Sequence, residues 1–245
     1  MSDLLNKTIG EIVAKDFRTA AIFTSNKMDF CCGGHKTVKE VCEKKNVDEA
    51  ALIANLEAVL RTKPENQIDF LSWPLDLLSD YIVKTHHRYV TEKIPVIQQY
   101  LTKLCRVHGE RHPELLEVNQ LFSECAEALT AHLQKEENIL FPFIAEMVEA
   151  KIQGGKPENP HFGTVDNPIN MMVHEHEAEG ERLIKIATLT NEYNPPVDAC
   201  NTYRVAFAML KDFEQNLHVH VHLENNILFP KAIEMEKSFS EPVLN

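Results

Sequence analysis

Two segments of the chain nearly repeat each other: HLQKEENILFP at 132–142 and HVHLENNILFP at 220–230. Both contain His, Glu, Asn, Ile, Leu, Phe and Pro at matching positions, and such agreement over eleven residues is improbable by chance. Residues i and i+4 of a helix lie on one face, so each segment presents an imidazole and a carboxylate side by side. The pairs are His132 with Glu136 and His220 with Glu224, and each is able to chelate a metal ion from one helix.

The repeated segments lie on the second and fourth of four long helices that the sequence predicts. These helices cover about 72–109, 113–153, 167–191 and 197–237, with proline or glycine residues near most of their ends. Long helices with short connections are typical of an antiparallel up-down four-helix bundle, here assigned to residues 70–240. Residues 1–62 form a small helical domain, in which short helices flank Phe30–Gly34 and another covers 48–60. The polar, proline-containing stretch 61–66 is read as a linker.

Hydrophobic periodicity indicates which polar residues face the bundle core. On the second helix the apolar stripe passes through His132, Glu136 and Ile139, and the fourth helix repeats this stripe through His220 and Glu224. On the first helix the apolar row contains His87 rather than His86, and on the third it contains His176 rather than His174. The inward candidates for metal binding are therefore His87, His132, Glu136, His176, His220 and Glu224.

Six nitrogen and oxygen donors are too many for one tetrahedral zinc ion, but they suit two ions bridged by carboxylates and an oxo or hydroxo group. The ligand set favours two iron ions, with manganese or zinc as lesser alternatives. A single inward histidine is more often a hydrogen-bonded core residue, and a single His-x-x-x-Glu is usually a surface pair. Two buried carboxylates, however, need a counter-cation, and the duplication favours a dinuclear site.

Several neighbouring residues receive weaker interpretations. Glu137 is discounted as a ligand because its counterpart is Asn225, and Glu175 is interpreted as solvated rather than as part of an access route. We expect Pro142 and Pro230 to kink their helices just beyond the ligands. The histidines assigned to the surface are His35, His108, His112 and His161.

The adjacent cysteines Cys31 and Cys32, followed by Gly33 and Gly34, form a second candidate site. A disulfide between neighbouring cysteines closes a strained ring, so the alternatives are two thiols, other pairing partners, or contact with a metal or cluster. The simpler reading is a structural cysteine beside a turn. We favour a thiol role for Cys31 and Cys32 in catalysis or transfer.

Composition excludes several classes of protein. The 37 acidic and 25 basic residues give a net charge of −12, which disfavours partners that present phosphate backbones or anionic lipids. The sequence has neither a glycine-rich phosphate loop nor an apolar run of the roughly 18 residues that a membrane span needs. These features, with a start that lacks a signal-peptide pattern, lead us to expect a cytoplasmic protein without nucleic-acid or membrane partners.

With these residues identified, nearly the whole chain resembles the repair-of-iron-centres family, which joins a vicinal-cysteine domain to a hemerythrin-like bundle. The resemblance rests on DFCCGG at 29–34, the His87 helix with Pro95, the two repeated segments, and MMVHEHEAEG at 171–180. It implies a non-haem di-iron centre held by the same six ligands. It also implies cytoplasmic repair of iron–sulfur clusters damaged by nitric oxide or peroxide, often by a homodimer.

Three functions remain open from the sequence, the third being a pure iron or redox sensor. The first is a repair protein whose clients are damaged iron–sulfur proteins, acting by iron donation or redox support with help from Cys31 and Cys32. The second is a hemerythrin-like protein that binds dioxygen, or that binds and reduces nitric oxide. The sequence does not decide whether the protein is an enzyme, but the cysteine pair favours repair because a simple oxygen carrier does not need it.

Overall fold

The computed structural model describes residues 3–62 and 68–239, and it confirms the all-helical fold. In these ranges the structure shows helices and turns, together with an isolated β-bridge between Thr8 and Thr37. The described residues divide into two compact units. One contains 79–146 and 158–218, and the other contains the residues up to 78, 147–157 and those from 219 onward.

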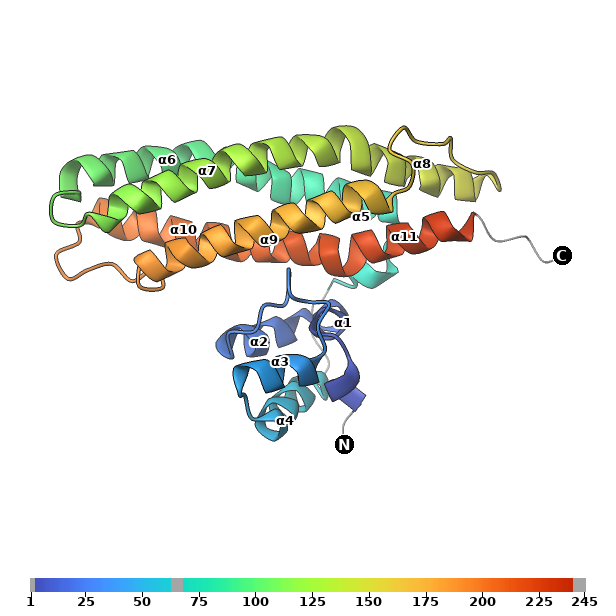
Figure 1. The fold of residues 1–245 in the computed structure, drawn as a ribbon, viewed down its shortest axis with the longest axis horizontal. Helices are drawn as coiled ribbons and strands as arrows, with labels where there is room; N and C mark the ends of the chain where they lie inside the picture. Colours follow the sequence, from blue (N-terminus) through green and yellow to red (C-terminus); the bar gives the residue numbers. More distant parts are fainter. Residues whose placement is uncertain (1–2, 63–67, 240–245) are drawn as a thin grey trace. The chain divides into compact units, whose positions relative to one another are not determined.

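The first of these units contains most of the four-helix bundle (Figure 1). Its helices are α6 (Arg88–His108), α7 (Glu114–Lys135), α9 (Asp166–Leu189) and α10 (Asn201–Leu223), the last of which continues beyond the unit. Helix α7 packs against both α6 and α9. The short connection around Gly109 makes α6 and α7 antiparallel neighbours. The core includes Phe122 and Phe213, whose ring centroids are 5.3 Å apart.

Three of the long helices are interrupted by a π-helical turn. These turns are η4 (Val83–His87), η5 (Glu136–Leu140) and η6 (Glu224–Leu228). They connect α5 (Leu75–Ile82) to α6, α7 to α8 (Phe141–Ile152), and α10 to α11 (Phe229–Ser238). A π-turn holds one more residue per hydrogen-bonded ring than an α-helix, and it often marks a functional site. Sequence periodicity predicts the four helices but not these turns.

One residue of the predicted apolar stripe lies in the π-turn of the first repeat and is exposed. Sequence periodicity places Ile139 on the apolar stripe, but 38% of this residue is exposed, whereas Leu140 is 1% exposed. Ile139 lies inside η5, whose hydrogen-bonded ring is wider than that of an α-helical turn. Pro142 is the second residue after η5 and has no N–H to donate to an α-helical ladder, so an altered hydrogen-bond pattern is accommodated here.

The other unit contains the amino-terminal helices α1 (Ile9–Lys15), α2 (Ala20–Ser25), α3 (Val38–Lys45) and α4 (Glu49–Leu60). Short 3-10 turns cover Asp3–Asn6, Phe17–Thr19 and Phe70–Ser72. Thr8 and Thr37 begin α1 and α3 with capping boxes, which satisfy free backbone N–H groups. Two helices precede the cysteine motif, whereas the sequence predicted one stretch there. The described residues leave out 63–67, and with them most of the predicted linker.

Within this unit, Asn226 of η6 packs into a space that two glycines leave open. Its Nδ2 donates to the carbonyl oxygen of Phe30 at 3.0 Å and lies 2.9 Å from Nδ1 of His222. A Cβ atom on Gly10 or Gly34 would overlap the Asn226 side chain. Both glycines are therefore required by close packing.

Replacing Gly34 with alanine is expected to destabilise the fold by about 1–3 kcal/mol, which lowers Tm by several degrees. The added methyl group would collide with Asn226 and with the backbone of Phe30. Gly155→Ala is the matched control, because its Cβ would meet only one atom, the carbonyl oxygen of Ala150 at 3.8 Å. Thermal unfolding of the two variants checks the prediction, and equal Tm values would contradict it.

Candidate metal centre

The structure buries all six residues that the sequence selected as metal ligands. The two carboxylates are fully buried, and each imidazole is at most 3% exposed; the residues are His87, His132, Glu136, His176, His220 and Glu224. Burying charged carboxylates costs several kcal/mol unless they are paired or bind a cation. The chemistry of the donor set therefore fits a metal centre.

The ligand atoms form two groups that share both glutamates. One group contains His87 and His220, and the other contains His132 and His176; each is completed by Glu136 and Glu224. In each group, one donor atom from every residue lies within 4.8 Å of the others. Two histidines for each group and two common carboxylates are the arrangement expected for two ions with carboxylate bridges.

Glu136 has a central place among these donors. Its Oε2 lies 3.4 Å from Nε2 of His87 and 3.4 Å from Nε2 of His132. On α10, Nε2 of His220 lies 2.8 Å from an oxygen of Glu224, one helical turn further on. The π-turns begin at Glu136 and Glu224, so each repeat places its carboxylate where the helical hydrogen-bond pattern changes.

Two further carboxylates orient histidines of the centre, and the sequence analysis missed this role. Glu137 Oε1 lies 2.8 Å from Nδ1 of His87, and Glu175 Oε2 lies 2.8 Å from Nδ1 of His132. An imidazole that donates from Nδ1 keeps its Nε2 lone pair for a metal ion. The reading of Glu175 as merely solvated is therefore wrong. Its position beside His176 in the sequence was the available signal.

Glu175 also pairs with Lys135, which lies on the same helix as His132. Burial raises the pKa of Glu175, but hydrogen bonds from Lys135 and His132 outweigh this effect and hold its pKa below the ordinary value. The carboxylate is therefore charged at neutral pH and accepts the Nδ1 proton of His132.

Replacing Glu175 with glutamine is expected to weaken metal affinity by about 10- to 100-fold, as is typical when an outer-shell partner of a ligand is changed. The amide removes the negative charge beside His132 but keeps the side chain's size. Glu181→Gln on the same helix is the control, because Glu181 is exposed. Competition with a chelator of known affinity measures the effect. Equal affinities for the two variants would contradict the assigned role.

Three histidines outside the ligand set are buried, and for His86 and His108 this differs from the environment predicted from the sequence. His86 is buried, and its Nδ1 lies 3.1 Å from Oδ1 of Asn216. His108, assigned to the surface from the sequence, is also buried, with its Nε2 3.3 Å from Sγ of Cys200. His222 packs against Phe17 and Phe30. These histidines lie outside the two ligand groups, and His86 is buried although the apolar rows placed it away from the core.

Cys31 and Cys32 are thiols rather than a disulfide, because their sulfur atoms are 3.8 Å apart. Cys31 is buried, and Cys32 is partly exposed. A hydrogen bond with Cys32 and burial raise the pKa of the Cys31 thiol well above its ordinary value, and the Asp29 carboxylate adds to this effect. When no metal ion is bound to it, the Cys31 thiol is therefore protonated at neutral pH.

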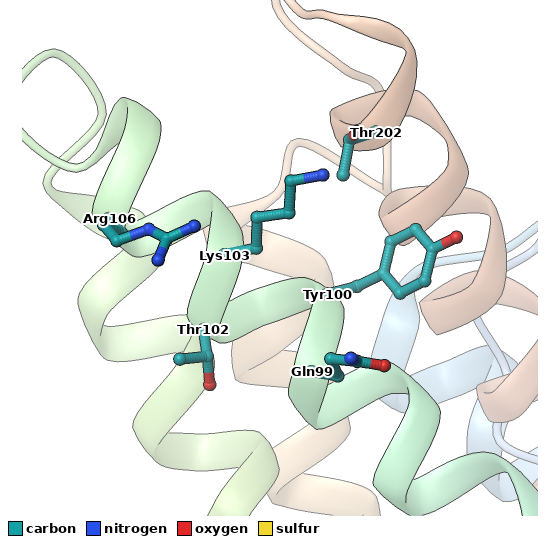
Figure 2. A pocket seen from close by; sticks show the side chains of 6 residues that line it. All are labelled: Gln99, Tyr100, Thr102, Lys103, Arg106 and Thr202. Atoms are coloured by element: carbon teal, nitrogen blue, oxygen red, sulfur yellow. The ribbon is translucent and has the colours of Figure 1, made fainter.

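A pocket of about 470 Å³ lies on α6 and at the start of α10, apart from the ligand groups (Figure 2). None of the residues that line it is a proposed metal ligand; they are Gln99, Tyr100, Thr102, Lys103, Arg106 and Thr202. Figure 2 shows the ammonium group of Lys103 directed toward Thr202. Over residues 3–62 and 68–239, no helix is long and apolar enough to cross a membrane.

The fold and its buried donors are those of a hemerythrin-type cation-binding protein. Residues 78–232 match the hemerythrin HHE cation binding domain, and residues 5–60 match ScdA_N, a domain of unknown function (DUF542).

Relatives with known names match almost the entire chain. The iron-sulfur cluster repair protein YtfE of Yersinia pestis is 35% identical over 234 residues, which cover 96% of this chain and 100% of the relative. The protein of the same name from Yersinia pseudotuberculosis serotype O:3 (strain YPIII) is 34% identical with the same coverage. This chain belongs to the family of these iron–sulfur cluster repair proteins, which confirms the resemblance inferred from its motifs.

Proposed function

We propose that this protein repairs iron–sulfur clusters damaged by nitrosative and oxidative stress, using a di-iron centre in its helical bundle. The observation that carries the proposal is the pair of buried two-histidine groups that share Glu136 and Glu224. The names of the relatives support the same activity, and we expect damaged iron–sulfur proteins to be its clients.

In this proposal His87 and His220 would hold one iron ion and His132 and His176 the other. Glu136 and Glu224 would be shared by both ions. When bound, the ions supply exchangeable iron and one-electron redox chemistry. Four imidazoles and two carboxylates do not fill the coordination of two octahedral ions, so positions remain for small ligands from outside. Nitric oxide and dioxygen are ligands of suitable size and chemistry.

The chain's own residues orient the donors and limit the access of water. Glu137 and Glu175 hold the Nδ1 atoms of His87 and His132, as described above. The ring of Phe141 stacks on His87 with 5.7 Å between ring centroids, and Phe141 is itself buried. An apolar wall beside a metal ligand lowers the local dielectric and strengthens the interaction between the carboxylates and the ions.

The test is to incubate the iron-loaded protein with an enzyme whose iron–sulfur cluster has been damaged by nitric oxide. Iron donation predicts that enzyme activity recovers while the protein loses iron in proportion. Redox support predicts recovery in the presence of a reductant without that loss of iron. Catalytic reduction of nitric oxide to nitrous oxide, with no recovery of the enzyme, would contradict repair and support the alternative function.

A homodimer and a contribution of Cys31 and Cys32 are also part of the proposal, on the basis of the family resemblance. Analytical ultracentrifugation tests the dimer. For the cysteines, the variant Cys31→Ser/Cys32→Ser is compared with the native protein in the same repair assay. Full recovery of the enzyme by that variant would remove the thiols from the mechanism.

A further inference from the structure

The turn that contains Cys31 and Cys32 is organised by the carboxylate of Asp29. Asp29 Oδ1 accepts the backbone N–H groups of Cys31 at 2.9 Å and Cys32 at 3.1 Å, and Oδ2 accepts that of Gly33 at 2.9 Å. Three hydrogen bonds from consecutive residues fix the backbone of the turn. The directions of the two cysteine side chains therefore follow largely from the backbone, as in a preorganised site.

The turn is also held from the far end of the chain, within the same compact unit. Asn226 donates to the carbonyl oxygen of Phe30 at 3.0 Å. Nδ2 of Asn225 lies 3.5 Å from the carbonyl oxygen of Cys31. In the first copy of the repeat, Asn138 instead donates to Gln134 of its own helix. The second copy therefore uses its asparagine to support the cysteine turn.

The separation of the two sulfur atoms fits a single metal ion. In tetrahedral sites a metal–sulfur bond is about 2.3 Å long, so two thiolates on one ion lie about 3.8 Å apart. The sulfur atoms of Cys31 and Cys32 are already 3.8 Å apart. Asp29 Oδ1 is 3.1 Å from the Cys31 sulfur, and one donor atom from each of the three residues lies within 4.8 Å of the others.

From this geometry we infer that Asp29, Cys31 and Cys32 form a second metal site, separate from the histidine and glutamate groups. The site would bind one thiophilic divalent cation such as Zn²⁺, Co²⁺ or Fe²⁺, because two sulfur donors and one carboxylate favour borderline or soft ions. The cation replaces the two thiol protons, which are released to solvent. Its charge of +2 balances the two thiolates, so that the site with the Asp29 carboxylate carries a net charge of −1.

Three protein donors leave one position of a tetrahedron for an outside ligand. Asp29 is exposed and Cys32 is partly exposed, so that position is open to solvent. A cysteine thiolate of a client protein has the chemistry to occupy it, which would make this a transfer site for iron. The transfer role rests on the proposed repair function, whereas the binding of the cation does not.

The test uses Co²⁺ alone, added to the full iron-loaded chain with reduced thiols and without oxygen. The expected result is a thiolate-to-cobalt charge-transfer absorption that saturates at one equivalent per chain. The histidine and glutamate groups contain no thiolate and cannot produce this band. Glu136→Ala should retain the band, so a failed repair activity and a failed cysteine site are distinguishable.

Cys31→Ser/Cys32→Ser should lose the band, and the matched control Cys105→Ser/Cys200→Ser should retain it. Because Cys31 is buried, circular dichroism checks that the double variant folds. Cys32→Ser alone changes only the partly exposed position and provides a second test. This single variant should also lose saturable Co²⁺ binding. Asp29→Asn should weaken binding by about 10-fold, as expected for loss of a charged partner. No saturable band in the native chain, or an unchanged band in Cys32→Ser, would overturn the inference.

Discussion

Glu136→Ala is expected to reduce the iron content from about two ions per chain to fewer than one. Glu136 belongs to both ligand groups, and its Oε2 lies 3.4 Å from a histidine nitrogen of each. Its loss therefore removes a donor from both ions at once, whereas loss of a histidine affects one ion directly. The remaining histidines and Glu224 offer each ion three donors at most.

Metal analysis after reconstitution and gel filtration provides the measurement. Glu127→Ala is the matched control, because Glu127 is exposed on α7, the helix that leads into the Glu136 turn. The variant must also be shown to fold, which circular dichroism does independently of the metal. A folded Glu136→Ala protein that retains two iron ions would refute the assignment of Glu136 as a ligand shared by the two ions.

Acidification from about pH 6.5 to pH 4 is expected to destabilise the fold through His222 by about 3 kcal/mol. Burial lowers the pKa of His222 from 6.5 to about 4. The unfolded chain therefore binds this proton at a higher pH than the folded chain does. The contribution of neutral His222 to the free energy of unfolding is complete above pH 6.5, and it decreases as the pH falls from 6.5 to 4.

The surroundings of His222 explain why its cationic form is disfavoured. Its ring packs against the rings of Phe17 and Phe30, and its Nδ1 accepts a hydrogen bond from Asn226 at 2.9 Å. Protonation of His222 Nδ1 would place its N–H group opposite the Nδ2 amide group of Asn226, so that two hydrogen-bond donors face each other. The residues that contact His222 directly in these interactions include no carboxylate to compensate for the new charge.

The measurement is the free energy of unfolding of the metal-free protein at pH 7 and at pH 4.5, obtained with urea. Native protein should lose about 2 to 3 kcal/mol more over this interval than His222→Gln does. His161→Gln serves as the control, because His161 is exposed and should leave the native pH dependence intact. If His222→Gln shows the same loss as the native protein, the buried neutral histidine is not the cause.

The sequence predicts the bundle and selects six donors that lie together in the structure, for physical reasons that are local. Helical periodicity separates His87 from His86 and His176 from His174 because each pair differs in the apolar row to which it belongs. Contacts between different helices are not visible in such a pattern. The partners of His132 and His87, Glu175 and Glu137, become evident only when the helices are packed.

Two features of the sequence misled the prediction of burial. Ile139 follows the α-helical stripe, yet it is 38% exposed inside the π-turn η5, and periodicity has no way to report a change of hydrogen-bond register. His108 was assigned to the surface because it lies near a helix end, but Tyr203 packs against its ring. A residue near a helix end is buried when another helix covers it, and one helix's sequence does not contain that information.

The π-turns at Glu136 and Glu224 also affect how distant homologues should be aligned. Each turn accommodates one residue beyond the α-helical count. Deletion of a single residue there would restore a regular helix and preserve the length of the bundle to within about 1.5 Å, while removing the widened turn at which the shared carboxylate lies. A homologue with a one-residue gap at this position is therefore expected to keep the architecture but lose the centre, and the gap itself becomes a diagnostic mark.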